Sequence, residues 1–429
     1  MKKLLTATFA LLLAHSALAG VKIEHWVSPS GAKVYFVESR VLPMLDVQVD
    51  FIAGSMFDPA GKSGVAALTR GSLDLGAAER DETAIAEQLA DIGANLSGGA
   101  DTDRSSVSVR TLSARDKRDP ALETLRAVIQ QPRFDAAIFE REQGRTIAGL
   151  KEAMTQPASI AGKAFWAALY PTHPYGQQAT PESVAAVTRD DLVAFHARYY
   201  TASNASITLV GDISRSEAEK IAETLVAKLP KGEAITLPSA PQAPKGGDIK
   251  LPHPASQAHV YIGLPAIERG NPDFFPLVVG NYTLGGGGFV SRLMKEVRDK
   301  RGYAYSVYSY FAPMRQPGPF QIGLQTKRSQ AKDAIKVTRE VLAGFLKTGP
   351  SEEELAAAKA NLTGSFPLRL DSNKKILDNV TMIAFYGMPL DYLDHYQAKV
   401  QAVTAEDVKQ AFARRVRPAD LITVTVAAD

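Results

Sequence analysis

The chain has 429 residues, which is too long for one ordinary domain and predicts two or more. Hydrophobic residues make up 45% of it and charged residues 22%, as is typical of a globular protein with sizeable cores. Cysteine is absent, which excludes disulfides, thiolate nucleophiles and cysteine metal ligands.

Residues 1–19 have the features of a secretory signal peptide. Lys2 and Lys3 form a basic start, residues 4–13 an apolar centre that is too short to span a bilayer, and residues 17–19 a small-residue cleavage site. Its removal leaves 47 basic against 46 acidic residues, which gives no electrostatic case for nucleic acid or an anionic membrane as a partner. No later segment is predicted to insert into a membrane, and we expect a periplasmic protein.

The first part of the chain alternates between strand and helix patterns. A period of two residues predicts strands at 33–38, 45–52, 94–100 and 105–111, whereas residues 65–75, 79–92, 120–131 and 134–153 have helical patterns. The second part predicts strands at 259–264, 304–312 and 319–326. Its predicted helices are 274–284, 291–299, 330–347 and 351–368, the last opening with the capping box Ser351 to Glu354.

An internal repeat organises these elements. The segment from Val187 to Leu192 recurs as Val403 to Val408, a shift of 216 residues, and the strand-like residues 204–210 recur at 420–426 with the same shift. In each copy a threonine, Thr188 or Thr404, is placed to cap a helix that leads into a strand. A match over helix, turn and strand at a constant offset predicts two homologous halves.

A segment rich in proline and glycine separates the halves. We predict a first peptidase-like domain at 20–230, a linker at 231–250 and a second domain at 251–429. Strands in a block followed by helices in a block indicate α+β halves, each a mixed or antiparallel sheet with helices packed on one face.

Several segments, in this order, resemble the pitrilysin/insulinase family of zinc metallopeptidases. They are residues 51–59, residues 62–66, His173 to Gly176, Asn281 to Leu293 and Arg298 to Val307, with the glycine run Gly285, Gly286, Gly287 and Gly288 inside the fourth. The resemblance covers nearly the whole mature chain. It implies that the two halves form half of a clamshell.

The zinc-binding motif of that family, H-x-x-E-H, occurs nowhere in this sequence. When the motif is laid on residues 67–71, Ala67 and Gly71 stand at the histidine positions and Arg70 at the catalytic glutamate. The third ligand position falls near Ala148 or Gly149. These side chains offer zinc no donor atoms, and a permanent cation at position 70 would repel the metal. We therefore expect this chain to bind no metal.

The resemblance implies substrate-binding roles in the second half. In family members a tyrosine that matches Tyr305 donates a hydrogen bond to the substrate carbonyl, and an arginine that matches Arg298 holds the substrate backbone. The glycine run 285–288 is expected to be a tight, mobile turn that lets a substrate or partner backbone approach closely. Taken without the resemblance, Arg298 belongs to a charged helix face and Tyr305 to a strand pattern.

The sequence thus predicts a zinc-free, substrate-clamping subunit of a heterodimeric metallopeptidase that acts on peptides. A homologous partner chain with H-x-x-E-H would hold the zinc, and this chain alone would be inactive. Two alternatives stay open: a zinc-free scaffold or assembly protein, and a module that binds peptides without cleaving them.

Overall fold

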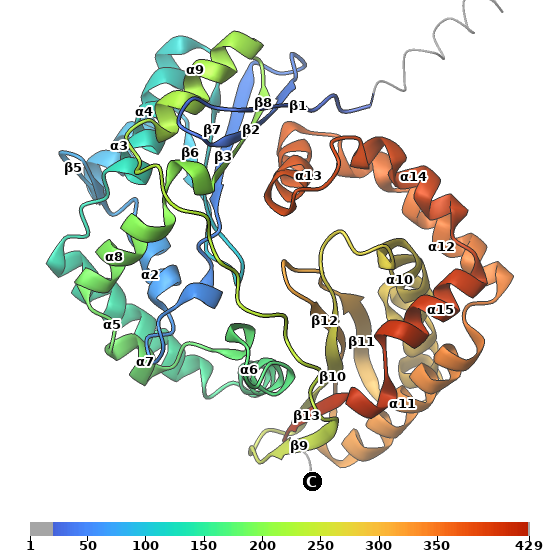
Figure 1. The fold of residues 1–429 in the computed structure, drawn as a ribbon. Coiled ribbons are helices and arrows are strands. Elements are labelled where there is room, and N and C mark those ends of the chain that lie inside the picture. The colour runs from blue at the N-terminus through green and yellow to red at the C-terminus, as the bar shows by residue number, and fades with distance from the viewer. Residues whose placement is uncertain (1–19, 428–429) are drawn as a thin grey trace, which may run out of the picture.

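The computed structural model describes residues 20–427, so the predicted signal peptide lies outside the described residues. Two halves of similar construction face each other (Figure 1). The first half contains β1 (Glu24–Val27), β2 (Lys33–Glu38), β3 (Met44–Phe51), α2 (Val65–Ser72), β4 (Gly76–Ala77), β5 (Arg80–Asp81), α3 (Glu82–Asp91), β6 (Asn95–Ser97), β7 (Ser105–Leu112), α4 (Arg115–Gln130), α5 (Ala136–Ala153), α6 (Pro157–Leu169), α7 (Pro181–Ala185), α8 (Arg189–Tyr199), β8 (Ala205–Gly211) and α9 (Arg215–Val226).

The second half repeats the mixture of strands and helices. It contains β9 (Gly247–Leu251), β10 (Gln257–Ile267), α10 (Phe274–Asn281), two π-helical turns (Tyr282–Gly286 and Met294–Asp299), β11 (Ala304–Phe311), β12 (Gly318–Lys327), α11 (Ala331–Thr348), α12 (Glu352–Gly364), α13 (Asn373–Tyr386), α14 (Tyr392–Ala402), α15 (Ala405–Arg415) and β13 (Ile422–Val426). The sequence patterns found most of the long elements but missed the helices α6, α7, α9, α13 and α14 and the short strands β1, β4, β5 and β9. The predicted helix at 291–299 is present, but residues 294–299 are wound as a wider π-helix.

The two sheets have the same topology, which confirms the prediction of two homologous α+β halves. The first has the strand order β1-β2-β8-β3-β7-β6 and the second β9-β13-β10-β12-β11, so only β1 lacks a counterpart. In each sheet one pair is parallel, β2 with β8 and β9 with β13, and the neighbouring pairs are antiparallel. Thr188 and Thr404 form the predicted caps at equivalent helices, each in a full capping box.

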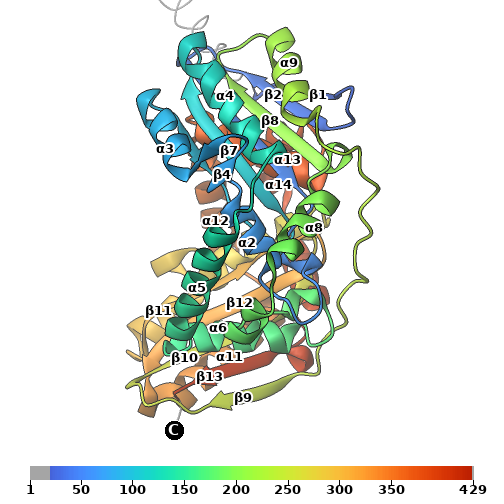
Figure 2. The ribbon, with the colours of Figure 1, turned by 90° about the vertical axis from the view of Figure 1, so that its left-hand side faces the viewer.

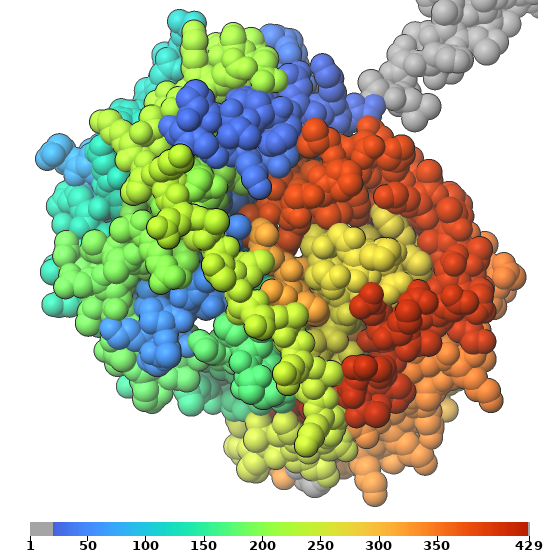
Figure 3. Space-filling model, in the orientation of Figure 1, coloured from blue at the N-terminus to red at the C-terminus, as the bar shows by residue number. Residues whose placement is uncertain are grey.

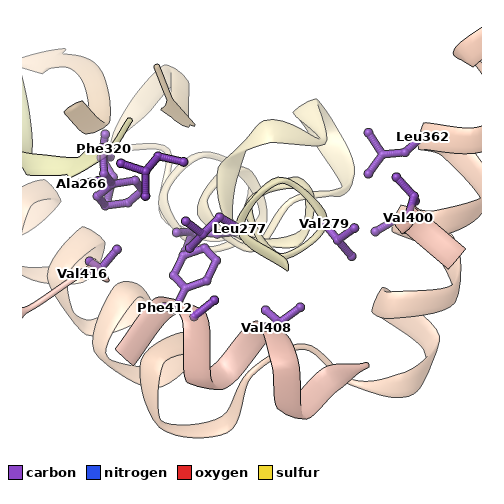
Figure 4. Close-up of a cluster of buried hydrophobic side chains, with 14 of the residues drawn as sticks. Ala266, Leu277, Val279, Phe320, Leu362, Val400, Val408, Phe412 and Val416 are labelled. Carbon is purple, nitrogen blue, oxygen red and sulfur yellow. The ribbon is translucent and has the colours of Figure 1, made fainter. Parts of the chain in front are cut away.

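Each half buries one face of its sheet under its own helices. In the first half alternate residues of β2, β3 and β8, such as Phe36, Val47 and Leu209, enter one core. In the second half α10 lies at the centre of the core and is surrounded by side chains from the sheet and from α12, α14 and α15 (Figure 4). Phe412 of α15 packs there beside Phe320 of β12, with ring centroids 6.4 Å apart.

The second face of each sheet is covered by a helix from the other half. α13 packs on β8 and β3 of the first sheet, whereas α6 packs on β13 and β10 of the second (Figure 1). Phe165 and Leu169 of α6 therefore share a core with Val424, and Tyr35 and Val37 of β2 join the core of the second half. α6 and α13 begin 216 residues apart, the shift of the repeat, so the exchange is reciprocal.

The predicted linker at 231–250 extends too far at its C-terminal end. Residues 230–246 have no regular structure and run along one side of the molecule (Figure 2). Residues 247–251, however, form β9, which pairs with β13 at the edge of the second sheet. The connector is therefore partly a component of the second domain.

Candidate functional site

The helix that matches the family's zinc helix is α2, and its side chains cannot hold zinc. Ala67 and Gly71 lie one turn apart on its exposed face, and Ala148 is exposed on α5, which packs against α2. Within residues 20–427 no group of three or more potential metal ligands gathers. A methyl group and a hydrogen atom offer the metal no donor, so the residues present do not fit a zinc ion.

Arg70 has a structural role in place of a catalytic one. Its side chain is buried, and its guanidinium donates hydrogen bonds to the backbone oxygens of Ser106 (2.5 Å) and Ser97 (2.9 Å). Nη1 also lies 3.4 Å from the carboxylate of Asp74. The guanidinium thus ties α2 to β6 and β7 with its fixed fork of donors.

Arg298 and Tyr305 are brought together by the fold. The Arg298 guanidinium carbon lies 5.8 Å from the centroid of the Tyr305 ring and 5.0 Å from that of Phe289. One nitrogen of Arg298 donates a 2.9 Å hydrogen bond to Asp299, while Tyr305 is 88% exposed and Phe289 67%. Cation–π contact holds the guanidinium beside the two rings and leaves the Tyr305 hydroxyl facing solvent.

Three backbone irregularities position this pair. Arg298 lies in the π turn at 294–299, a second π turn at 282–286 includes the first two glycines of the run, and a bulge interrupts β11 between Ala304 and Val307. The bulge places one extra residue on the edge strand, so Tyr305 and Ser306 both point outwards. Irregularities of these kinds concentrate at functional sites.

Close packing within the chain explains why glycine is needed at the first three positions of the run 285–288. A side chain at Gly285 would come within 2.6 Å of the Ser309 backbone, and one at Gly287 within 2.6 Å of the Tyr282 carbonyl. Gly288 has a φ of +59° and faces open space. The close backbone approach expected at this run is therefore made by the chain itself at its first three members. Substrate contact at residues 285–288 stays a prediction.

Phe289 is a member of this cluster that sequence reasoning missed. The signal was the apolar pair Phe289-Val290 directly after four glycines, since such residues in a turn are normally buried or used for binding. Asn281 fixes the turn from behind: its side-chain amide donates to the Ser309 carbonyl (2.9 Å) and its oxygen accepts from the Ser309 hydroxyl (2.6 Å).

Comparison with known proteins identifies the family to which this fold and this degenerate zinc helix belong. Residues 36–181 match the family model described as insulinase (peptidase family M16), and residues 186–362 match the model described as the peptidase M16 inactive domain. A crystal structure of a peptidase M16 inactive domain from Pseudomonas fluorescens superposes with a TM-score of 0.91 at 39% identity, covering 95% of this chain and 98% of that one. The chain belongs to the M16 peptidase family.

Two curated relatives differ in what their names say. The non-peptidase homolog YmxG of Helicobacter pylori is 26% identical over 89% of this chain and 88% of its own. The mitochondrial-processing peptidase subunit beta of Blastocladiella emersonii is 24% identical over 93% of this chain and 87% of its own. This chain is an M16 member without the family's zinc site, and no helix within residues 20–427 is long and apolar enough to cross a membrane.

Proposed function

We propose that this chain is the substrate-clamping, zinc-free subunit of a heterodimeric M16 metallopeptidase in the periplasm. A homologous partner chain with H-x-x-E-H would hold the zinc, and this chain would contribute Arg298 and Tyr305. The observation that carries the proposal is the contact of Arg298 with Tyr305 of a bulged edge strand, in a fold whose own zinc helix lacks ligands.

The chemistry of the pair suits this role. A phenol hydroxyl is a neutral donor that can stabilise the charge developing on a substrate carbonyl oxygen, and a guanidinium offers fixed, permanently charged donors for peptide backbone. The Tyr305 hydroxyl is free to turn towards a partner, because the residue is 88% exposed. A peptide could add as a strand beside β11, which is the edge strand of the second sheet.

Two further observations support an exported subunit. The sequence begins with a signal-like segment and contains no cysteine, which suits export to an oxidising compartment. One relative bears the name of a peptidase subunit and another that of a non-peptidase homolog, so both descriptions occur among similar proteins.

The test combines this protein with an exported homologue that carries H-x-x-E-H and is encoded in the same genome. We expect the two to co-purify and to cleave a quenched fluorescent peptide in a chelator-sensitive way, with neither chain active alone. Arg298→Ala and Tyr305→Phe should each lower kcat by roughly 10²- to 10³-fold without dissociating the pair. Arg301→Ala is the matched control, since that arginine pairs with Glu296 nearby and should leave activity unchanged.

Other outcomes would identify the alternatives. If the pair is active but indifferent to Arg298→Ala and Tyr305→Phe, the chain is a scaffold. If this protein alone binds peptides and no partner is recovered, it is a peptide-binding module. Chelator-sensitive cleavage by the isolated chain would contradict the proposal outright.

A further inference from the structure

A second site lies in the second half, away from Arg298 and Tyr305. A cavity of about 740 Å³ opens between three segments: residues 268–276, which lead from β10 into α10, residues 386–392 between α13 and α14, and residues 399–407 between α14 and α15. In Figure 3 these segments, coloured yellow, orange-red and red, meet on one face of the molecule. A volume of this size is within the range of small-molecule sites.

The walls of the cavity are largely aromatic. Phe274 and Phe275 pack edge to face, with centroids 5.3 Å apart, and Phe275 lies 6.0 Å from the ring of Tyr392. Tyr386 and Met388 complete the apolar lining. Such rings offer a flat guest both apolar area and offset-stacked or edge-to-face contacts.

Two cations reach the cavity without an anion to pair with. Arg269 lies with its guanidinium carbon 5.2 Å from the Tyr386 ring centroid, and Lys399 has its Nζ 5.5 Å from that of Phe275. Neither forms an ion pair within residues 20–427, and Nε of Arg269 is buried without a hydrogen-bond partner. Burial lowers the pKa of the Arg269 guanidinium.

The two carboxylates that also line the cavity are engaged elsewhere. Glu268 accepts a 2.7 Å hydrogen bond from the Asn271 side-chain amide, and Asp407 caps α15 by accepting from the backbone and hydroxyl of Thr404. Within residues 20–427 neither carboxylate forms an ion pair with Arg269 or Lys399. The two carboxylates also place negative charge at the rim, which disfavours a dianion such as phosphate monoester and favours a guest with a single negative charge.

We propose that this cavity binds a monoanionic carboxylate carried on an aromatic body, with the carboxylate on Arg269 and Lys399 and the ring between Phe274, Phe275 and Tyr392. Two sources share this chemistry: a small arylalkanoic acid, and the free carboxyl end of a peptide whose last residue is aromatic. The site does not depend on the proposed peptidase partnership, because none of its residues belongs to the Arg298–Tyr305 cluster.

Titration calorimetry on the full mature chain tests the site with matched pairs of probes. The first pair is 4-phenylbutyrate and 4-phenylbutan-1-ol, and the second is N-acetyl-Ala-Ala-Phe as the free acid and as the amide. We expect one acid to bind per chain, at least about tenfold more tightly than its neutral analogue. A hydrogen bond to a charged group typically strengthens binding by more than about tenfold. The tighter of the two acids identifies the source.

Variants then locate the binding. Arg269→Gln and Lys399→Met should each weaken the preferred acid by about tenfold and leave the neutral analogue unaffected, whereas Arg301→Gln on a distant surface should change neither. If Arg269→Gln does not fold, the site is still tested by Lys399→Met and by comparing the acid with its neutral analogue on the wild-type protein. Equal affinity for acid and neutral probes, no binding at millimolar concentration, or indifference to both charge-removing variants would overturn the proposal.

Discussion

The Tyr386 hydroxyl donates a 3.0 Å hydrogen bond to Oδ2 of Asp103, and so joins a helix of the second half to a loop of the first. The same carboxylate accepts from the Tyr175 hydroxyl at 2.5 Å and from the backbone of Arg315 at 2.8 Å. Asp103 is only 1% exposed, and burial raises its pKa despite these donors. One buried carboxylate thus gathers groups from both halves.

Replacing Tyr386 with phenylalanine should weaken the contact between the halves. The ring and its packing are retained, but the buried carboxylate loses one donor, so we expect the free energy of unfolding to fall by about 1–3 kcal/mol. Urea denaturation followed by circular dichroism measures this loss. Tyr305→Phe is the control and should stay within about 0.5 kcal/mol, because that hydroxyl faces solvent. If both variants lose the same free energy of unfolding, the hydrogen bond from Tyr386 to Asp103 does not stabilise the contact between the halves.

The exchange of α6 and α13 predicts that neither half folds alone. Residues 20–230 without α13 would leave one face of the first sheet uncovered, with Tyr35, Val37 and Val210 exposed to water. We expect this fragment to be insoluble or to lack near-ultraviolet circular dichroism. Co-expression of residues 20–246 with 247–429 should instead yield a soluble complex, since both helices can then dock. A well-folded monomeric fragment 20–230 would contradict the prediction.

Arg70→Ala should destabilise the chain although it lies at a would-be catalytic position. The substitution removes donors from the carbonyls of Ser106 and Ser97 and leaves a void beneath α2, at a cost of about 2–3 kcal/mol. Thermal or urea unfolding measures the effect. Arg145→Ala is the matched control, because that arginine is 73% exposed and its ion pair should contribute less than about 0.5 kcal/mol. An Arg70→Ala variant with an unchanged free energy of unfolding would contradict the structural role of Arg70.

Asp50 should make stability depend on pH. Burial raises its pKa to about 6 from an ordinary value of 3.8, so between these two pH values the folded state binds more protons than the unfolded state. The free energy of unfolding contributed by Asp50 is therefore greatest near pH 4 and decreases as pH rises through about 6, by roughly 2–3 kcal/mol. The difference in unfolding free energy between wild type and Asp50→Asn isolates this term. A difference that does not change between pH 4.5 and 7 would refute it.

Metal analysis of the isolated protein should find no stoichiometric zinc. Ala67, Arg70, Gly71 and Ala148 supply no ligand, and no other ligand cluster occurs among the described residues. Mass spectrometry of the dialysed protein measures the metal content, and the homologous H-x-x-E-H protein purified in parallel is the positive control. One zinc per chain here would overturn the assignment of these positions.

The candidate site could be predicted in part. Arg298 and Tyr305 were found through their spacing in a recognisable segment, but the contribution of Phe289 depends on how the turn after α10 folds back. The role of Arg70 was invisible for the same reason: its acceptors are backbone oxygens on β6 and β7, and a backbone oxygen carries no mark in the sequence. The aromatic cavity is built from three segments that no local pattern connects.

The repeated α+β halves follow from the amino-acid sequence, because periodicity and capping threonines are local patterns and the constant offset of 216 residues can be read along the chain. The loss of the zinc ligands follows from the sequence as well, since a side chain without donor atoms cannot bind metal in any fold. The reciprocal packing of α6 and α13 on the opposite sheets is visible only in the folded molecule, because a helix pattern shows which face is apolar but not which sheet covers that face. The folded molecule likewise shows where Arg269 and Lys399 lie without partners, since the burial of a charge depends on contacts between distant segments.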